Sequence, residues 1–285
     1  MAVAENSKLA RLLRKFHVYM KRQYDVCICI VGGEGKGKSR GLLLPIIDYW
    51  YKSILNRPVK TNSLGVSFEA FATALKTGEE FDICALDEAG EEMDRENHRN
   101  TLNTILFQAY TVIREKLFFT ILVLPDFFDL NPRFRKRRVR GVFEVYKRKD
   151  YECTSCGWEF VQRPECPKCQ CKKIKKGYIL WRYYSRQKLD EIIAKNQSRL
   201  IKRLSVVKPT YSGKSYKYDG PLLKPYAALK KGKMDDAINR IDKITNTVEV
   251  TSNVKCPACE SKDTRYVKKT DSMACRRCGN EWKKD

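Results

Sequence analysis

The sequence predicts an α/β fold, a mostly parallel sheet with helices on both faces, to which two small cysteine-based modules are added. Three short apolar runs, 26–31, 81–86 and 116–124, have the length of strands. Strands of a parallel sheet are covered on both faces and therefore read as nearly continuous apolar runs. Between these runs, apolar residues recur at helical spacing. Pairs of cysteines in two separate groups predict the two modules.

The first apolar run leads directly into a glycine-rich segment. Residues 32–39 fit the pattern G-x-x-x-x-G-K-[ST] without a mismatch, which is typical of P-loops that bind nucleotide phosphates. Glycines let backbone N–H groups curve round an anion, and the helix that follows presents its positive dipole end. We expect Lys38 to contact the β- and γ-phosphates of ATP and the Ser39 hydroxyl to ligate Mg²⁺. The full set predicted here is Gly32, Gly33, Glu34, Gly35, Lys36, Gly37, Lys38 and Ser39. The alternative is a glycine-rich turn that only starts a helix.

A pair of acidic residues follows the second apolar run. The run 81–86 ends at Asp87 and Glu88, an arrangement typical of the Walker B motif when a P-loop precedes it. We expect Asp87 to hold the magnesium shell and Glu88 to polarise the attacking water as a general base. The alternative is a pair of carboxylates that caps the next helix.

Composition restricts the partners. The chain has 285 residues, 57 Lys+Arg against 34 Asp+Glu, and a formal net charge of +23. Such an excess favours a polyanion, and DNA is favoured over a membrane surface because no basic helix stands beside a hydrophobic anchor. The longest apolar stretch is too short to cross a bilayer, and the first residues lack a signal-peptide pattern. Twelve cysteines then favour metal binding in a reducing compartment, and we expect a cytoplasmic protein.

The other predicted elements follow from periodicity. An amphipathic helix is expected over 7–22, packing on the sheet, with a DNA-facing or subunit-facing role as the alternative. A helix from Lys38 to about Leu55 should kink or stop early at Pro45. Further helices are expected over 67–76 and 97–115, and a turn with a dense basic block over 126–140. Strands at 142–146 and 178–184 should form a hairpin around the first cysteine group.

The cysteine spacing predicts two structural zinc sites. Thiolates at C-x2-C spacing can both reach one tetrahedral ion at about 2.3 Å, and four of them leave no position for a catalytic water. The expected ligands are Cys153, Cys156, Cys166 and Cys169 in the first site and Cys256, Cys259, Cys275 and Cys278 in the second. Cys171 is a spare or alternative ligand, and iron–sulfur ligation is the alternative chemistry. Cys27, Cys29 and Cys84 are expected to be small core residues.

These modules set the expected domains. A P-loop domain should cover 1–204, with a zinc ribbon inserted over 150–177. A basic linker with a helix over 229–244 should cover 205–253, and its residues 208–225 are expected to form a loop. Its tyrosines and lysines have single-strand stacking as an alternative role. A second zinc ribbon should cover 254–285. The histidines, His17 and His98, stand in no ligand or nucleophile motif.

The order of these motifs resembles a known family. A P-loop, a strand ending in DEAG, a helix ending in VIREK, the strand ILVLPDFFDL and the basic NPRFRKRRVR are similar to the FtsK/HerA-type DNA-translocating ATPases. The similarity is greatest to the small Zot-like members carried by viruses and mobile elements, and covers roughly residues 20–150. It implies ATP-driven movement of DNA by a ring, as a hexamer, in which an arginine from a neighbouring subunit contacts the γ-phosphate. By position that arginine is Arg114 or Arg138. Where the family has a polar sensor, usually glutamine, this chain has Asp126.

Two other functions remain open at the level of sequence. The GGEGKGKS loop also resembles that of adenylate kinases, some of which carry a four-cysteine zinc lid, so that a nucleotide-type kinase is one alternative. A zinc-ribbon DNA-binding protein whose P-loop only switches conformation, without turnover, is the other.

Overall fold

The chain forms two compact units, Met1–Ala227 and Ala228–Asp285. The computed structural model describes residues 3–60, 63–66, 68–87, 113–149, 151–160, 165–175, 177–197, 203–232, 235, 255–261, 264–267, 272–275 and 277–283. Within these residues no helix has the length and apolar content needed to cross a membrane.

A seven-stranded sheet forms the centre of the first unit, in the order β10-β9-β5-β1-β4-β3-β2. The strands are β1 Val26–Val31, β2 Leu64–Gly65, β3 Ile83–Leu86, β4 Phe119–Leu124, β5 Val139–Lys149, β9 Tyr178–Ser185 and β10 Tyr211–Tyr216. β2, β3, β4, β1 and β5 run parallel, β9 is antiparallel to β5, and β10 is antiparallel to β9. The prediction of a mixed α/β fold with a mostly parallel sheet is confirmed.

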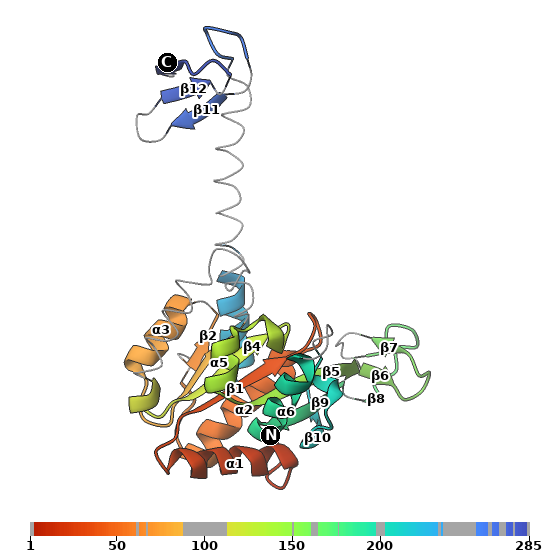
Figure 1. Ribbon diagram of the computed structural model, residues 1–285. Coiled ribbons are helices and arrows are strands. Elements are labelled where there is room, and N and C mark those ends of the chain that lie inside the picture. Colours follow the sequence, from red (N-terminus) through yellow and green to blue (C-terminus); the bar gives the residue numbers. More distant parts are fainter. Residues whose placement is uncertain are drawn as a thin grey trace. The chain divides into compact units, whose positions relative to one another are not determined.

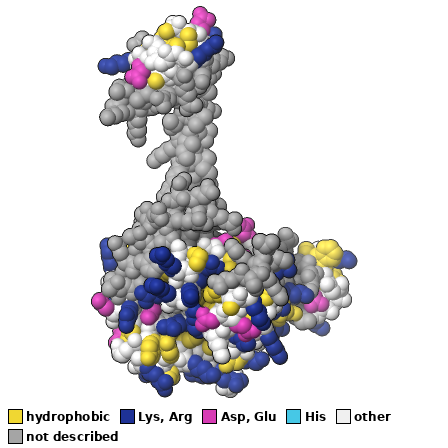
Figure 2. All heavy atoms as spheres, in the orientation of Figure 1, with side chains coloured by type: hydrophobic (Ala, Val, Ile, Leu, Met, Phe, Trp, Pro, Cys, Tyr) yellow, Lys and Arg dark blue, Asp and Glu magenta, His cyan; other side chains and the backbone are white. Residues whose placement is uncertain are grey.

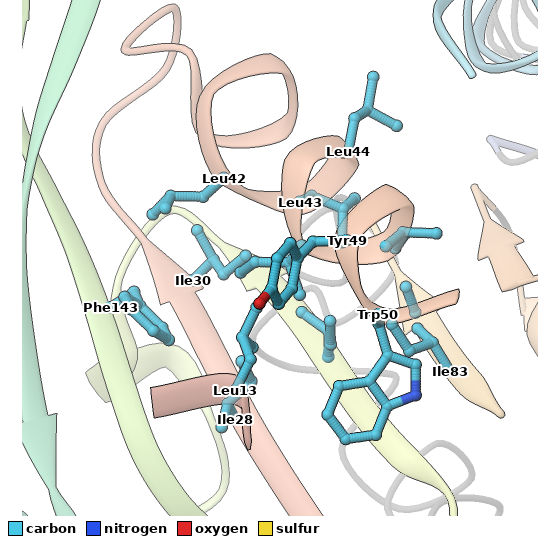
Figure 3. Packing of buried hydrophobic residues seen from close by; sticks show 14 of the residues in the cluster. Leu13, Ile28, Ile30, Leu42, Leu43, Leu44, Tyr49, Trp50, Ile83 and Phe143 are labelled. Atoms are coloured by element: carbon cyan, nitrogen blue, oxygen red, sulfur yellow. The ribbon is translucent and has the colours of Figure 1, made fainter. Parts of the chain in front are cut away.

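One face of the sheet is covered by the N-terminal helix and by the helix that follows the glycine-rich loop. α1 Lys8–Met20 starts at Ser7, whose hydroxyl accepts a hydrogen bond from Ala10 N at 3.1 Å, and it buries its apolar side on the sheet. The second helix consists of η1 Ser39–Leu43, α2 Leu44–Tyr49 and η2 Trp50–Leu55. Figure 3 shows its Leu42 near Ile30 of β1 and its Trp50 beside Ile83 of β3, all within one buried cluster.

Pro45 does not end the helix: helical structure continues past it to Leu55, so the alternative of an early stop is wrong. Wide π-type turns stand before and after α2. The helix ends at Asn56, which adopts a left-handed conformation with φ 52°.

The opposite face is covered by α3 Phe68–Thr77, α5 Pro132–Arg137 and α6 Arg186–Gln197, so the sheet lies between two helical layers (Figure 1). Cys27, Cys29 and Cys84 are fully buried in this layer, as predicted. Burial raises the pKa of the Cys29 and Cys84 thiols, which keeps both thiols neutral. Two short 3₁₀ turns, η4 Phe127–Asp129 and η5 Leu204–Val206, also belong to the layer on this face of the sheet.

Some expected irregular segments are ordered elements. The basic segment 126–140 contains α5, which starts at Asn131, where the side-chain oxygen accepts from Arg133 N at 2.9 Å. The loop predicted over 208–225 is wrong for Tyr211–Tyr216, which form the edge strand β10. Of the helix predicted over 97–115, residues 113–115 are helical and the rest lie outside the described residues. For the helix predicted over 229–244, residues 223–232 are helical, and beyond them only residue 235 is described before 255.

Each cysteine group sits on a small three-stranded sheet. The first, between β5 and β9, has the order β7-β6-β8, with β6 Tyr151–Cys153, β7 Glu159–Phe160 and β8 Ile174–Lys175. The second, in the Ala228–Asp285 unit, has the order β11-β12-β13, with β11 Thr264–Val267, β12 Ser272–Cys275 and β13 Glu281–Lys283. The expected hairpin of β5 and β9 around an insertion is therefore confirmed.

Candidate functional site

The glycine-rich loop leaves the carboxyl end of β1 against the neighbouring strands. Gly32 has φ +148°, and a Cβ there would stand 2.5 Å from the carbonyl oxygen of Val145 on β5. Its N–H donates to the carbonyl of Pro125, which follows β4, at 3.1 Å. Only glycine fits between β5 and the end of β4 at this point without moving the backbone.

The loop curves because its glycines adopt conformations that other residues avoid. Gly35 and Gly37 have φ +67° and +84°, and Lys36 between them does not have a positive φ. Alternation of this kind occurs in anion-binding nests, where successive backbone N–H groups point to one concave side. From the β5–β9 hairpin, Arg148 Nη1 donates to Gly35 O at 2.6 Å, and Ile179 packs against Gly37. The hairpin therefore holds the outer side of the loop.

The two loop lysines have different positions. The Lys38 ammonium donates to Gly32 O at 2.5 Å, so its side chain crosses the loop from the helix end to the strand end. The Lys36 ammonium donates to Tyr146 O on β5, at 3.4 Å. Lys38 is therefore the lysine that reaches across the concave part of the loop.

Ser39 and Asp87 meet at the carboxyl edge of the sheet. Ser39 begins the helix after the loop, and Asp87 follows β3 with 3% of its surface exposed. The Ser39 hydroxyl donates to Asp87 Oδ2 at 2.9 Å. A hydroxyl and a carboxylate are the hard oxygen ligands that Mg²⁺ prefers, so the donor set fits that ion. Glu88 lies outside the described residues.

A third side chain in this group comes from far along the chain. The Tyr226 hydroxyl donates to the same Oδ2 of Asp87. Tyr226 belongs to no motif and is separated from Asp87 by 139 positions, so no local pattern in the sequence indicates it.

The predicted sensor position also lies beside the loop. Asp126 follows β4 and lines a cavity of about 260 Å³ with Gly32, Gly33, Lys36 and Glu144 among its walls. Its carboxylate accepts a hydrogen bond from Phe128 N at 3.0 Å and so caps the turn η4. Asp126 therefore lies beside the loop, where the predicted sensor should stand. The contact that its carboxylate makes stabilises the turn η4.

The two candidate arginines lie at the other edge of the sheet. Arg114 comes shortly before β4, and Arg138 comes directly before β5. The register pairs Val26 with Phe119 and Cys27 with Val139, so these strand starts face the amino end of β1. The loop stands at the carboxyl end of this strand, about 17 Å away. The structure does not bring Arg114 or Arg138 to the loop of their own chain.

The eight predicted zinc ligands gather as two quartets. In each, the four sulfur atoms lie within 4.8 Å of one another. Sulfur–sulfur distances are 3.5 Å for Cys153–Cys169 and 3.6 Å for Cys156–Cys166, Cys256–Cys278 and Cys259–Cys275. A zinc tetrahedron with bonds of about 2.3 Å has edges of about 3.8 Å, so both quartets could hold structural zinc.

Backbone groups favour the thiolate form of one buried cysteine in each quartet, Cys153 and Cys256, whereas in Cys169 and Cys278 a backbone N–H lowers the pKa but the neighbouring sulfurs raise it to about 12. Burial of Cys153 would raise its pKa, but the N–H groups of Cys156 and Ser155 point to its sulfur and lower the pKa to about 6. Burial opposes the thiolate of Cys256 in the same way, and the N–H groups of Ala258 and Cys259 lower its pKa to about 7. Thiolates are the form that binds zinc.

Cys171 stands outside the first quartet. Its sulfur lies 3.0 Å from Ser155 Oγ and accepts from Lys173 N at 3.3 Å. These contacts agree with the role of a spare cysteine.

His17 is a packing residue. Its ring meets Trp50 and Phe81 edge-on, with centroids at 5.7 and 5.6 Å. Burial, together with the nearby Lys21, lowers its pKa. His98 lies outside the described residues.

The carboxyl edge of the sheet thus gathers the glycine-rich loop, Lys38, Ser39 and Asp87, with Tyr226 as an addition. No family model matches this sequence, and no curated protein matches it. The function is therefore inferred from the residues of this edge and from the two cysteine quartets.

Proposed function

We propose that this protein is a Mg²⁺-dependent ATPase that uses hydrolysis to move DNA. The observation that carries the proposal is the 2.9 Å hydrogen bond between Ser39 and Asp87. It joins the end of a P-loop sequence to the acidic end of a second strand, and both parts are needed for one magnesium-nucleotide site. A glycine-rich turn that served only to start a helix would not require this partner.

Each residue has a defined task in the proposed reaction. Backbone N–H groups of the loop hold the phosphates, and the Lys38 ammonium neutralises charge on the β- and γ-oxygens. Ser39 and Asp87 would hold Mg²⁺, which supplies further charge neutralisation at those oxygens. Glu88 takes a proton from the water that attacks the γ-phosphorus.

The charge of the chain supports DNA as the partner. The net charge is +23, and lysine and arginine side chains are spread over the visible face of the sheet-containing unit (Figure 2). In the basic segment after β4, Arg133, Lys136 and Arg137 are exposed on α5, with the spacing of one helix face. Arg135 instead stacks over Phe128 at 5.1 Å, and Arg140 lies over Tyr19 at 5.9 Å. The three exposed residues are the basic residues of this segment with the greatest access to phosphates, since Arg135, Arg138 and Arg140 are half-buried.

A ring of subunits completes the proposed site. Arg114 and Arg138 lie at the sheet edge opposite their own loop, so either would reach a γ-phosphate only from a neighbouring subunit. We propose a homo-oligomeric ring, a hexamer by resemblance to FtsK/HerA-type ATPases of viruses and mobile elements, working in the host cytoplasm. The two cysteine quartets would carry structural zinc.

Steady-state ATP hydrolysis, measured with and without linear duplex DNA, tests the proposal. We expect hydrolysis that requires Mg²⁺ and rises when DNA is added. Phosphoryl transfer to a nucleoside monophosphate would instead identify a kinase. DNA binding without any turnover would identify a switch protein and contradict the motor.

A further inference from the structure

The oxygen of Asp87 that faces Ser39 has a second donor. Asp87 Oδ2 accepts hydrogen bonds from the hydroxyls of both Ser39 and Tyr226. Tyr226 is buried, with 6% of its surface exposed, so this contact is an internal one. A carboxylate oxygen has two lone pairs, and these two hydroxyls occupy both.

The segment that carries Tyr226 is fixed to the helix after the loop. Tyr218 N donates to Arg40 O at 2.8 Å, directly beside Ser39 in the sequence, and Arg40 Nη2 donates to Tyr218 O at 3.4 Å. From there, Leu222 N donates to the Tyr218 hydroxyl at 3.4 Å, and Tyr226 N donates to Leu222 O at 3.1 Å. Residues 218–226 therefore form a strap from Arg40 to Asp87, both of which belong to the proposed nucleotide site or its border.

When magnesium and nucleotide bind, Asp87 Oδ2 would have to accept a contact from the magnesium site in place of one of its two hydroxyl donors. Mg²⁺ keeps several waters when it binds to protein carboxylates. Ser39 can give an oxygen lone pair to the ion and still donate its proton to Asp87. To hold Mg²⁺ or one of its waters through Oδ2, Asp87 needs the other lone pair of that oxygen, and this is the lone pair that the Tyr226 hydroxyl occupies.

We propose that Tyr226 competes with the magnesium shell for Asp87, so that loading of Mg²⁺-nucleotide releases the strap 218–226. This inference rests on the proposed nucleotide site. Tyr226 stands directly before the boundary at Ala227–Ala228, where the second compact unit begins. Release of the strap frees the segment that joins the two units, and it makes that segment responsive to the nucleotide.

Nucleotide binding by the full chain at increasing Mg²⁺ concentration tests the competition, with a non-hydrolysable ATP analogue as the probe. Tyr226→Phe removes the hydroxyl and keeps the ring. We expect the Mg²⁺ concentration at half-maximal binding to fall by about threefold or more, the effect of removing one competing hydrogen bond. Binding of the analogue in EDTA should not change. Tyr216→Phe is the matched control, because Tyr216 lies on β10 with 47% of its surface exposed, and its midpoint should equal that of the wild type.

Amide hydrogen exchange gives a second measurement that does not depend on turnover. In the wild type, the amides of residues 222–226 should exchange faster after Mg²⁺-nucleotide is added. In Tyr226→Phe they should exchange fast without it. An unchanged or raised Mg²⁺ midpoint in a folded Tyr226→Phe protein would overturn the competition while leaving the nucleotide site intact. A wild-type protein that binds no Mg²⁺-nucleotide would overturn the proposed function and this inference together.

Discussion

Lys38 and Lys36 are two positions apart in the sequence, and their ammonium groups donate to different backbone carbonyls. Lys38 crosses the loop to Gly32 O, and Lys36 contacts Tyr146 O on β5. Lys38→Ala should therefore reduce ATP turnover by about two orders of magnitude or more, because the cation at the transferred phosphate is removed. Lys36→Ala, with the same change of charge, should keep most of the turnover. Steady-state hydrolysis of the two variants makes the comparison, and equal losses would contradict the assignment of Lys38.

Glu88 is predicted to act on the water and not on the nucleotide. Glu88→Gln should bind ATP with wild-type affinity and hydrolyse it about 10²- to 10⁴-fold more slowly, the range for loss of a general base. Equilibrium binding and single-turnover hydrolysis separate the two quantities. If turnover of this variant stays near normal, another group is the base.

Among the elements, α5 is the surface that we propose to contact DNA. Arg133, Lys136 and Arg137 are exposed on it, whereas Arg135 is held over Phe128 by stacking. Replacing the three exposed residues with alanine should weaken duplex binding. It should also make the plot of log affinity against log salt shallower by about 2.7, because each phosphate that the protein no longer neutralises reduces the slope by about 0.9. Binding titrations at several salt concentrations measure this slope.

The control for α5 removes the same charge elsewhere. Lys8, Arg11 and Lys15 are exposed on α1, and their replacement by alanine should change the slope much less. Equal changes of the slope in both triple variants would show that DNA binding depends only on net charge. They would contradict the proposal that α5 contacts the DNA.

Elements that are determined by their own local sequence could be predicted. Elements that form only because they pair with a distant segment could not. β1, β3 and β4 are apolar runs, and the residue spacing of the loop motif and of the C-x2-C pairs is enough to predict their local geometry. β10, YSGKSY, is polar, and it is a strand because it pairs with β9, where Gly213 leaves room for Trp181. The position of β4 between β1 and β3 is likewise a property of the whole sheet.

The same limit applies at the site. Lys38, Ser39 and Asp87 stand in short motifs, so sequence alone indicated them. Arg148 reaches the loop from 113 positions away, and Tyr226 reaches Asp87 from 139 positions away. Nothing in their immediate sequence distinguishes them from the other arginines and tyrosines of the chain.

At the scale of the whole molecule, the number of bound zinc ions per chain tests the two cysteine quartets directly. The full-length protein should contain two zinc ions per chain, one for each quartet. Cys171→Ser should leave that number at two, because its sulfur contacts Ser155 and Lys173 and not the quartet. Elemental analysis measures the content. Absence of zinc, or the visible absorbance of an iron–sulfur cluster, would refute this prediction.

The assembly is tested by mixing inactive subunits. Since Arg114 and Arg138 lie away from their own loop, the arginine that contacts the γ-phosphate in the proposed ring would act on the loop of a neighbouring subunit. Arg138→Ala mixed with Lys38→Ala should recover part of the turnover, because some interfaces then combine an intact loop with an intact arginine. The same mixture with Arg114→Ala identifies which arginine acts. Hydrolysis by dilute monomers, without recovery in either mixture, would exclude the ring.

The way the first cysteine module joins the sheet makes it an exchangeable part. Its residues leave and re-enter the β5–β9 hairpin at Lys149 and Tyr178, which face each other as a register pair. The next pair, Arg148 and Ile179, already contacts the glycine-rich loop. Since antiparallel strands can be closed by a two-residue turn, the module can be gained, removed or replaced without shifting the register that supports the loop. For a protein engineer this junction is a graft site, and for evolution it is a position where other modules can be inserted at little cost to the strand ends that carry the glycine-rich loop.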